Sequence, residues 1–149
     1  MRTAVPLGVG LILLVTLSCS SVTPVAVRTG DICDGCRRTI DNVKIAAEIV
    51  PAAGRLPLKF RTVSCMARYV HEHGNLDGEV FVTDFDSGRL IPARTATFVR
   101  SEIDENTKTL DYFAFRDFKA AVAFGKKTGG SSSDWPSILK RASAEAGAN

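Results

Sequence analysis

Cysteine is the residue type that most limits how this chain can be held together. The 149-residue sequence has four cysteines, and Cys19 closes an apolar N-terminal segment, which leaves Cys33, Cys36 and Cys65 for the folded part. In an oxidising compartment, three cysteines cannot form a complete set of disulfides, so at least one thiol is free, bound to a metal or paired with another molecule. The hydrophobic content of 45% is high enough for a packed core.

The N-terminal segment predicts export. One positive charge at Arg2 precedes the almost entirely apolar stretch Ala4–Leu17, which is short for a membrane span and is followed by polar sequence. This pattern is typical of a secretory signal peptide, here over residues 1–18. The end of the segment, Leu17-Ser18-Cys19, resembles a bacterial lipobox, which implies acylation of Cys19 and a lipid anchor that faces the periplasm. Ser20 favours the outer membrane in a Gram-negative cell; the alternative is an ordinary signal peptide with an incidental cysteine.

Charge excludes one class of partner. Nineteen Lys and Arg against sixteen Asp and Glu give a net charge of +3, and the two signs are scattered along the chain. There is no basic run that could follow a phosphate backbone, so nucleic acid is not an expected partner.

The hydrophobic pattern that follows predicts an α+β fold. Residues 19–30 are small and polar around Pro24 and are expected to form a lipidated tether. Period-2 runs bounded by Pro and Gly predict strands, and longer runs behind capping residues such as Thr62 or Ser64 predict helices. Strands are expected at 43–50, 55–60, 79–83, 89–92, 97–100 and 110–115, and helices at 62–73, 118–127 and 137–146.

These elements form two small β-β-α units, the first followed by another strand, which suggests an internal repeat. The domain is expected over residues 31–130, and residues 131–149 are expected to form a linker and a C-terminal helix. The Gly and Ser residues at 129–133 predict a flexible join.

The candidate site consists of sulfur ligands. Cys33 and Cys36 form a C-x-x-C motif, in which Gly35 permits the tight turn that lets both thiols meet one metal ion or each other. Cys65 and Met66 stand at the start of the first expected helix. Thiolates and a thioether suit Cu(I) or Zn(II) and do not suit Ca²⁺ or Mg²⁺.

Each of these residues also has a structural explanation. Cys33 and Cys36 can form a simple disulfide, and Cys65 and Met66 can be packing residues of a helix. His71 and His73 lie six and eight residues after Cys65, so neither shares its helix face closely, and a solvated helix end is the better explanation for both.

A redox enzyme is the competing explanation of the C-x-x-C motif. Such a motif is reactive when it begins a helix, whose dipole lowers the first thiol's pKa, and no helix is expected after Cys36. Arg37 and Arg38 would still stabilise a thiolate. The sequence has no G-x-S-x-G, P-loop or H-E-x-x-H motif, so we expect no catalysed reaction.

From Asp31 to about Gly130, the chain resembles the NosL-type copper-binding lipoproteins that accompany nitrous oxide reductase and help to supply its copper. The resemblance consists of an ordered series of motifs behind the lipobox. They are Asp31–Cys36, Ala46–Ile49, Phe60–Tyr69 with its Cys65-Met66 pair, Val82–Gly88, Ile91–Ala93, Ala96–Val99, Ala114-Phe115, Ala120–Phe124 and Gly129-Gly130.

The resemblance implies a pair of β-β-α-β units and a membrane-anchored copper chaperone that catalyses no reaction. Its implied partner is a copper-accepting apoenzyme such as nitrous oxide reductase. Cys36 is the best-matching ligand position, Cys33 matches a position that is often Cys, and Cys65 serves as a third thiolate if the fold brings the helix start close. Arg38 and Leu110 occupy positions where the family usually has methionine, and such a thiolate-rich site admits Zn(II) as well as Cu(I). A redox protein, or a module with a structural disulfide or zinc staple, is the alternative function.

Overall fold

The computed structural model describes residues 22–52, 55–74 and 77–148, so the expected signal peptide and Cys19 lie outside the described residues. The elements are strands β1 (Ala47–Pro51), β2 (Leu58–Phe60), β3 (Gly78–Thr83), β4 (Leu90–Pro92), β5 (Thr97–Asp104), β6 (Thr109–Phe115) and β7 (Ser131–Ser133), helices α1 (Val63–His73), α2 (Phe118–Thr128) and α3 (Trp135–Ala146), and short 3-10 turns η1 (Val43–Ile45) and η2 (Ala93–Thr95). In this described part, no helix has the length and apolar content to cross a membrane.

Two antiparallel sheets give the fold its internal repeat. The first sheet has the strand order β2-β1-β3-β4, and the second has the order β6-β5-β7. In each unit, the first strand lies between its hairpin partner and the strand that follows the helix. The series β1-β2-α1-β3 and β5-β6-α2-β7 therefore share one topology, which confirms the α+β class with its C-terminal helix α3.

Two elements differ from the sequence prediction. Val43–Ile45 is a 3-10 turn and not the start of a strand, because the side chain of Asn42 accepts a hydrogen bond from the Lys44 amide and holds the backbone in a turn. Residues 131–133, expected to be a flexible join, form edge strand β7, in which Ser133 pairs with Phe98 of β5. Gly130 permits this pairing, since a Cβ there would lie 2.6 Å from the carbonyl oxygen of Arg100.

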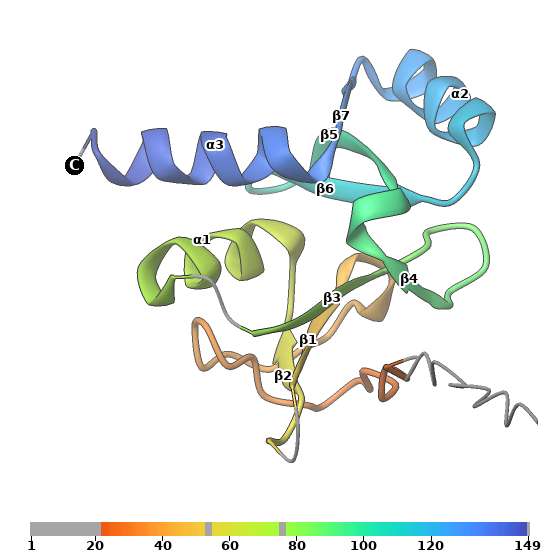
Figure 1. Cartoon of the computed structure of the whole chain (residues 1–149). Helices are drawn as coiled ribbons and strands as arrows, with labels where there is room; N and C mark the ends of the chain where they lie inside the picture. The colour runs from red at the N-terminus through yellow and green to blue at the C-terminus, as the bar shows by residue number, and fades with distance from the viewer. Residues whose placement is uncertain (1–21, 53–54, 75–76, 149) are drawn as a thin grey trace, which may run out of the picture.

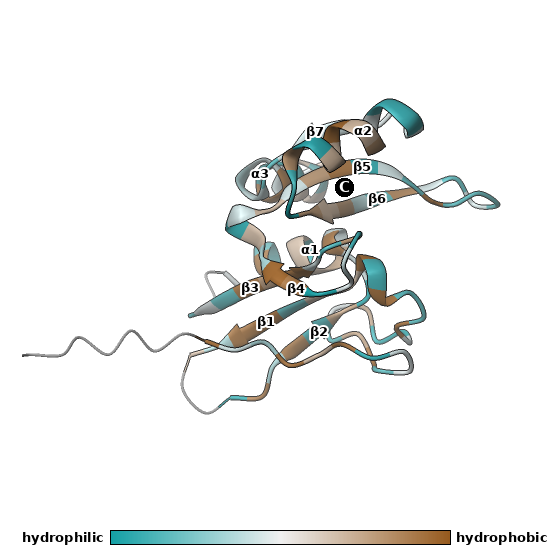
Figure 2. Ribbon diagram, turned by 90° about the vertical axis from the view of Figure 1, so that its right-hand side faces the viewer, coloured by the Kyte–Doolittle hydropathy of each residue, from teal (hydrophilic) through white to brown (hydrophobic). Residues whose placement is uncertain are grey.

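The two sheets lie on either side of α1, with α3 beside it, and α2 covers the far face of the second sheet (Figures 1 and 2). Successive residues of β5 point to opposite faces, so Phe98 joins the main core and Val99 joins a smaller one under α2. The main core unites Phe60 of β2, Met66 of α1 and Ile138 of α3, all fully buried. The first sheet thus has one face in the core and one outer face.

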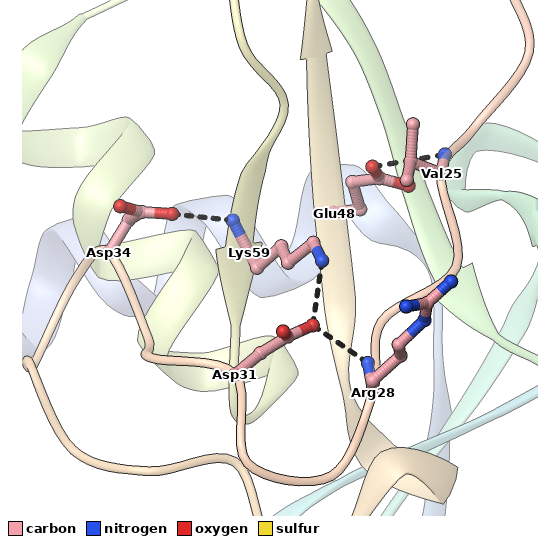
Figure 3. Close-up of polar contacts among 6 residues, drawn as sticks. All are labelled: Val25, Arg28, Asp31, Asp34, Glu48 and Lys59. Carbon is pink, nitrogen blue, oxygen red and sulfur yellow. Dashed lines mark hydrogen bonds and ion pairs between the residues drawn. The ribbon is translucent and has the colours of Figure 1, made fainter.

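The described part of the expected tether, residues 22–30, runs along this outer face without regular structure. The Val25 amide donates a hydrogen bond of 3.1 Å to Glu48 of β1, which is fully buried, and Val27 packs against the main core (Figure 3). This segment therefore contacts the sheet well before the chain reaches the C-x-x-C motif.

Candidate metal centre

The C-x-x-C motif lies in a tight turn that its own backbone closes. Ile32 and Thr39 pair as a β-bridge at its base. The Cys33 amide donates to the carbonyl of Arg38 at 2.9 Å, and the Arg37 amide donates to the carbonyl of Cys33 at 2.9 Å. Arg37 takes a left-handed φ of 61°. No helix follows Cys36, as the sequence predicts, so the thiol-activating geometry of a helical C-x-x-C motif is absent from this described segment.

Asp34 attaches this turn to the edge strand β2. The Asp34 amide donates to the Lys59 carbonyl at 2.7 Å, and the Lys59 amide donates to the Asp34 carboxylate at 2.7 Å. The Lys59 ammonium also forms an ion pair of 2.7 Å with Asp31, whose carboxylate accepts the Arg28 amide (Figure 3). Lys59 therefore holds both the turn and the segment before it against the first sheet.

The same strand leads directly into α1, which carries the third thiol. Thr62 caps α1 by accepting a hydrogen bond of 3.2 Å from the Cys65 amide, so Cys65 lies in the first helical turn. A Cβ on Gly35 would lie 2.9 Å from the Cys65 sulfur. The turn and the helix start are thus packed against each other, and glycine is the residue that lets them approach.

The three thiols converge. The Sγ atoms of Cys33, Cys36 and Cys65 all lie within 4.8 Å of one another, and Cys33 Sγ is 3.4 Å from Cys65 Sγ. All three thiols are free. Cys33 is buried, Cys65 is half-buried and Cys36 is exposed. The cluster therefore has two sulfurs set into the protein and one that meets the solvent.

Protonation of the cluster is uneven. Burial raises the pKa of the Cys33 thiol, but hydrogen bonds from the Cys36 and Arg61 amides and from the neighbouring thiols outweigh burial and lower that pKa overall. Burial raises the pKa of the Cys65 thiol, and its contact with Cys33 raises it further. Cys33 therefore ionises before Cys65.

The spacing of the sulfurs fits a shared metal ion. Thiolates bound to one ion at about 2.3 Å lie about 4 Å from one another. The separation of 3.4 Å and the limit of 4.8 Å in this cluster bracket that value. Three sulfur donors form the type of ligand set that soft metals such as Cu(I) and Zn(II) prefer.

Met66 and the two histidines differ in their relation to the cluster. Met66 follows Cys65 in α1 and is fully buried in the main core, to which Cys33 also belongs. His71 and His73 are exposed at the end of α1, and neither belongs to the cluster that the described residues form. His73 instead stacks on Tyr69, with a ring distance of 3.9 Å. Leu110 is 44% exposed. Asp34 lies inside the C-x-x-C motif, but its contacts with Lys59, which position the cluster, follow from no pattern in the sequence.

The fold and the cluster together define a small α+β protein in which three free thiols, one of them exposed, converge at a spacing that suits a soft metal. The sequence profile of the NosL family matches residues 24–142, and the chain belongs to this family. A solved structure, described as the copper chaperone NosL from Shewanella denitrificans, is similar in fold, with a TM-score of 0.64 and 18% sequence identity over 76% of this chain and 93% of that chain. No curated protein matches the sequence.

Proposed function

We propose that this protein is an extracytoplasmic copper(I) chaperone that holds its cargo with Cys33, Cys36 and Cys65. The convergence of three free thiols within 4.8 Å is the observation that carries the proposal. Membership of the NosL family and the fold shared with a NosL copper chaperone support copper as the cargo. The protein binds and transfers the metal and catalyses no reaction.

The graded exposure of the thiols suits transfer by ligand exchange. Cys33 and Cys65 hold the ion from the protein side, while Cys36 is exposed. A sulfur ligand of the recipient can therefore reach the ion at Cys36 before the two inner thiolates release it. Binding displaces thiol protons, so uptake is coupled to proton release.

The sequence and the family support a proposal for the location and the recipient. The apolar segment before Cys19 and the lipobox-like sequence support export and a lipid anchor that faces the periplasm. We propose a copper-accepting apoenzyme as the partner, with nitrous oxide reductase as the recipient that the family resemblance implies. Met66, next to Cys65, is the proposed thioether neighbour of the site, and Zn(II) is the alternative cargo.

Anaerobic titration with Cu(I) against a chromogenic chelator tests the proposal. The wild-type chain is expected to remove Cu(I) from the chelator, and Cys36→Ala is expected to bind more weakly because one of three donors is lost. Ser143→Ala, an exposed change on α3, serves as the control. A Cys36→Ala chain that binds as tightly as wild type would refute the assignment.

Two further results would favour the alternatives. Insulin-reducing activity that depends on Cys33 and Cys36 would indicate a redox protein. Loss of folding on chelation, with no exchange of metal between proteins, would indicate a structural staple.

A further inference from the structure

A second candidate site lies in the groove between α1 and α3, which run side by side in the same direction (Figure 1). The groove contains a cavity of about 460 Å³, with a floor from β5 and β6. This volume is typical of small-molecule sites, which range over about 300–1,000 Å³. Its polar lining consists of Ser64, Arg68, Glu72, Arg100, Tyr112, Arg141 and Glu145.

A tyrosine at the floor has a hydroxyl without a described protein partner. Tyr112 is only 3% exposed as a residue and lines the cavity. Its hydroxyl is not among the fully buried unpartnered atoms of the described residues, so it is open to a ligand or to solvent. Burial raises the pKa of Tyr112, against the nearby charges of Arg141 and Arg100, so the phenol stays a proton donor.

Three arginines line the same cavity. Arg100 stands directly opposite Tyr112 in the β5–β6 pair, Arg68 comes from α1 and Arg141 comes from α3. Each of the five ion pairs in the described part of the chain involves other residues, so no described carboxylate lies within 4.0 Å of these guanidinium groups. Their donors are therefore free to bind an anion that enters the groove.

The glutamates of the groove lie at one end. Glu72 follows Arg68, and Glu145 follows Arg141, by four residues, which is about one helical turn or 6 Å along each axis. Because the two helices run in the same direction, both glutamates lie toward the same end (Figure 1). Arginine four residues before glutamate is also the weaker order for an intrahelical ion pair. The groove is therefore basic around Arg68, Arg100 and Arg141 and acidic toward the ends of the two helices.

We propose that this groove binds a small zwitterionic molecule, with its carboxylate or phosphate held by Arg68, Arg100, Arg141 and the Tyr112 hydroxyl and its ammonium facing Glu72 and Glu145. Guanidinium groups bind the paired oxygens of carboxylate and phosphate through two parallel hydrogen bonds. The alanines that line the walls, Ala67, Ala142 and Ala146, leave room for a short aliphatic linker between the two charges. This site does not depend on the function proposed for the thiol cluster.

Isothermal titration of the purified chain tests the proposal with two probes, phosphoethanolamine and 4-aminobutanoate. Both carry an ammonium, so their relative affinities show whether the arginines take phosphate or carboxylate. Inorganic phosphate and succinate lack the ammonium. They are expected to bind at least about tenfold more weakly than the better zwitterion, which corresponds to a difference of about 1.4 kcal/mol in binding free energy. Equal binding of these anions would contradict the role of the glutamates.

Variants separate the groove from general surface binding. Tyr112→Phe removes only the unpartnered hydroxyl and is expected to weaken binding about fivefold to tenfold. Arg141→Ala is expected to weaken it by at least about tenfold, since a hydrogen bond to a charged group is lost. Lys140→Ala, an exposed charge that does not line the groove, is the matched control and should change nothing. Failure of both zwitterions to bind up to millimolar concentration, or binding that Tyr112→Phe and Arg141→Ala leave unchanged, would overturn the proposal.

Discussion

Substituting Gly35 by alanine should disturb the thiol cluster without removing any of its sulfurs. The added Cβ would lie 2.9 Å from the Cys65 sulfur, 3.4 Å from the Cys65 carbonyl oxygen and 3.5 Å from a ring carbon of Phe60. An unstrained contact of this kind is about 3.5–4.0 Å, so the sulfur or the turn must move by roughly 0.6–1.1 Å. The turn has little freedom to move, because the amide and the carboxylate of Asp34 both hydrogen-bond to the backbone of Lys59 in β2.

A movement of this size matters for a metal site, where ligand distances are kept to within about 0.2 Å. We therefore expect Gly35→Ala to lower the Cu(I) affinity by about tenfold to a hundredfold, the range for residues that position metal ligands. The free energy of unfolding should fall by about 1–3 kcal/mol, as for other overpacked sites.

The assay is the competition titration with a Cu(I) chelator, combined with urea unfolding of the same preparation. Gly147→Ala is the matched control, since its Cβ would lie 3.7 Å from the nearest neighbour, the Ser143 carbonyl oxygen, which is an ordinary contact. If Gly35→Ala binds Cu(I) as tightly as wild type, the close approach of the turn to Cys65 does not shape the site, and the reasoning is wrong.

Three other substitutions test separate parts of the structure. Thr62→Ala removes the cap of α1 and should cost about 1 kcal/mol in urea unfolding, whereas Thr62→Ser should restore most of it. Burial raises the pKa of Glu48 in the folded protein. The folded protein therefore loses stability as the pH rises from the pKa of Glu48 in the unfolded chain to its raised pKa, and the full cost of the buried charge remains above that pH. Glu48→Gln should therefore stabilise the fold at neutral pH and flatten its dependence on pH, and a lower stability at neutral pH would contradict this. Met66→Leu conserves core volume and should cost less than about 1.5 kcal/mol. A weaker Cu(I) affinity in the same variant is the result expected of a thioether ligand, and an unchanged affinity would assign Met66 to the core alone.

The sequence predicted most elements because their signals are local. Thr62, Asp117 and Asp134 all cap the helices that follow them, and each does so with its own side chain. β7 carries no such signal, because Ser131–Ser133 pairs through its backbone and depends on Gly130 for the approach to Arg100. Val43–Ile45 has the composition of a strand, but the Asn42 side chain accepts a hydrogen bond from the Lys44 amide and the segment forms a 3-10 turn.

For the site, the sequence indicated three thiols as candidate ligands but not how they converge. The C-x-x-C spacing predicts that Cys33 and Cys36 are close, since a tight turn joins them. The arrival of Cys65 depends on contacts between distant segments, namely the two hydrogen bonds between Asp34 and Lys59, which hold the turn to the strand that leads into α1. No local pattern in the sequence encodes those contacts, so they could not be predicted.

The attachment of the N-terminal segment has a mechanical consequence for the lipid anchor proposed at Cys19. A force applied at Val22 meets the Val25–Glu48 hydrogen bond first, then the Gly30–Ile40 hydrogen bond and the Asp31–Lys59 ion pair, before it reaches Cys33. With the proposed anchor, a pull on the chain would load these contacts before it loads the turn that carries two of the thiols.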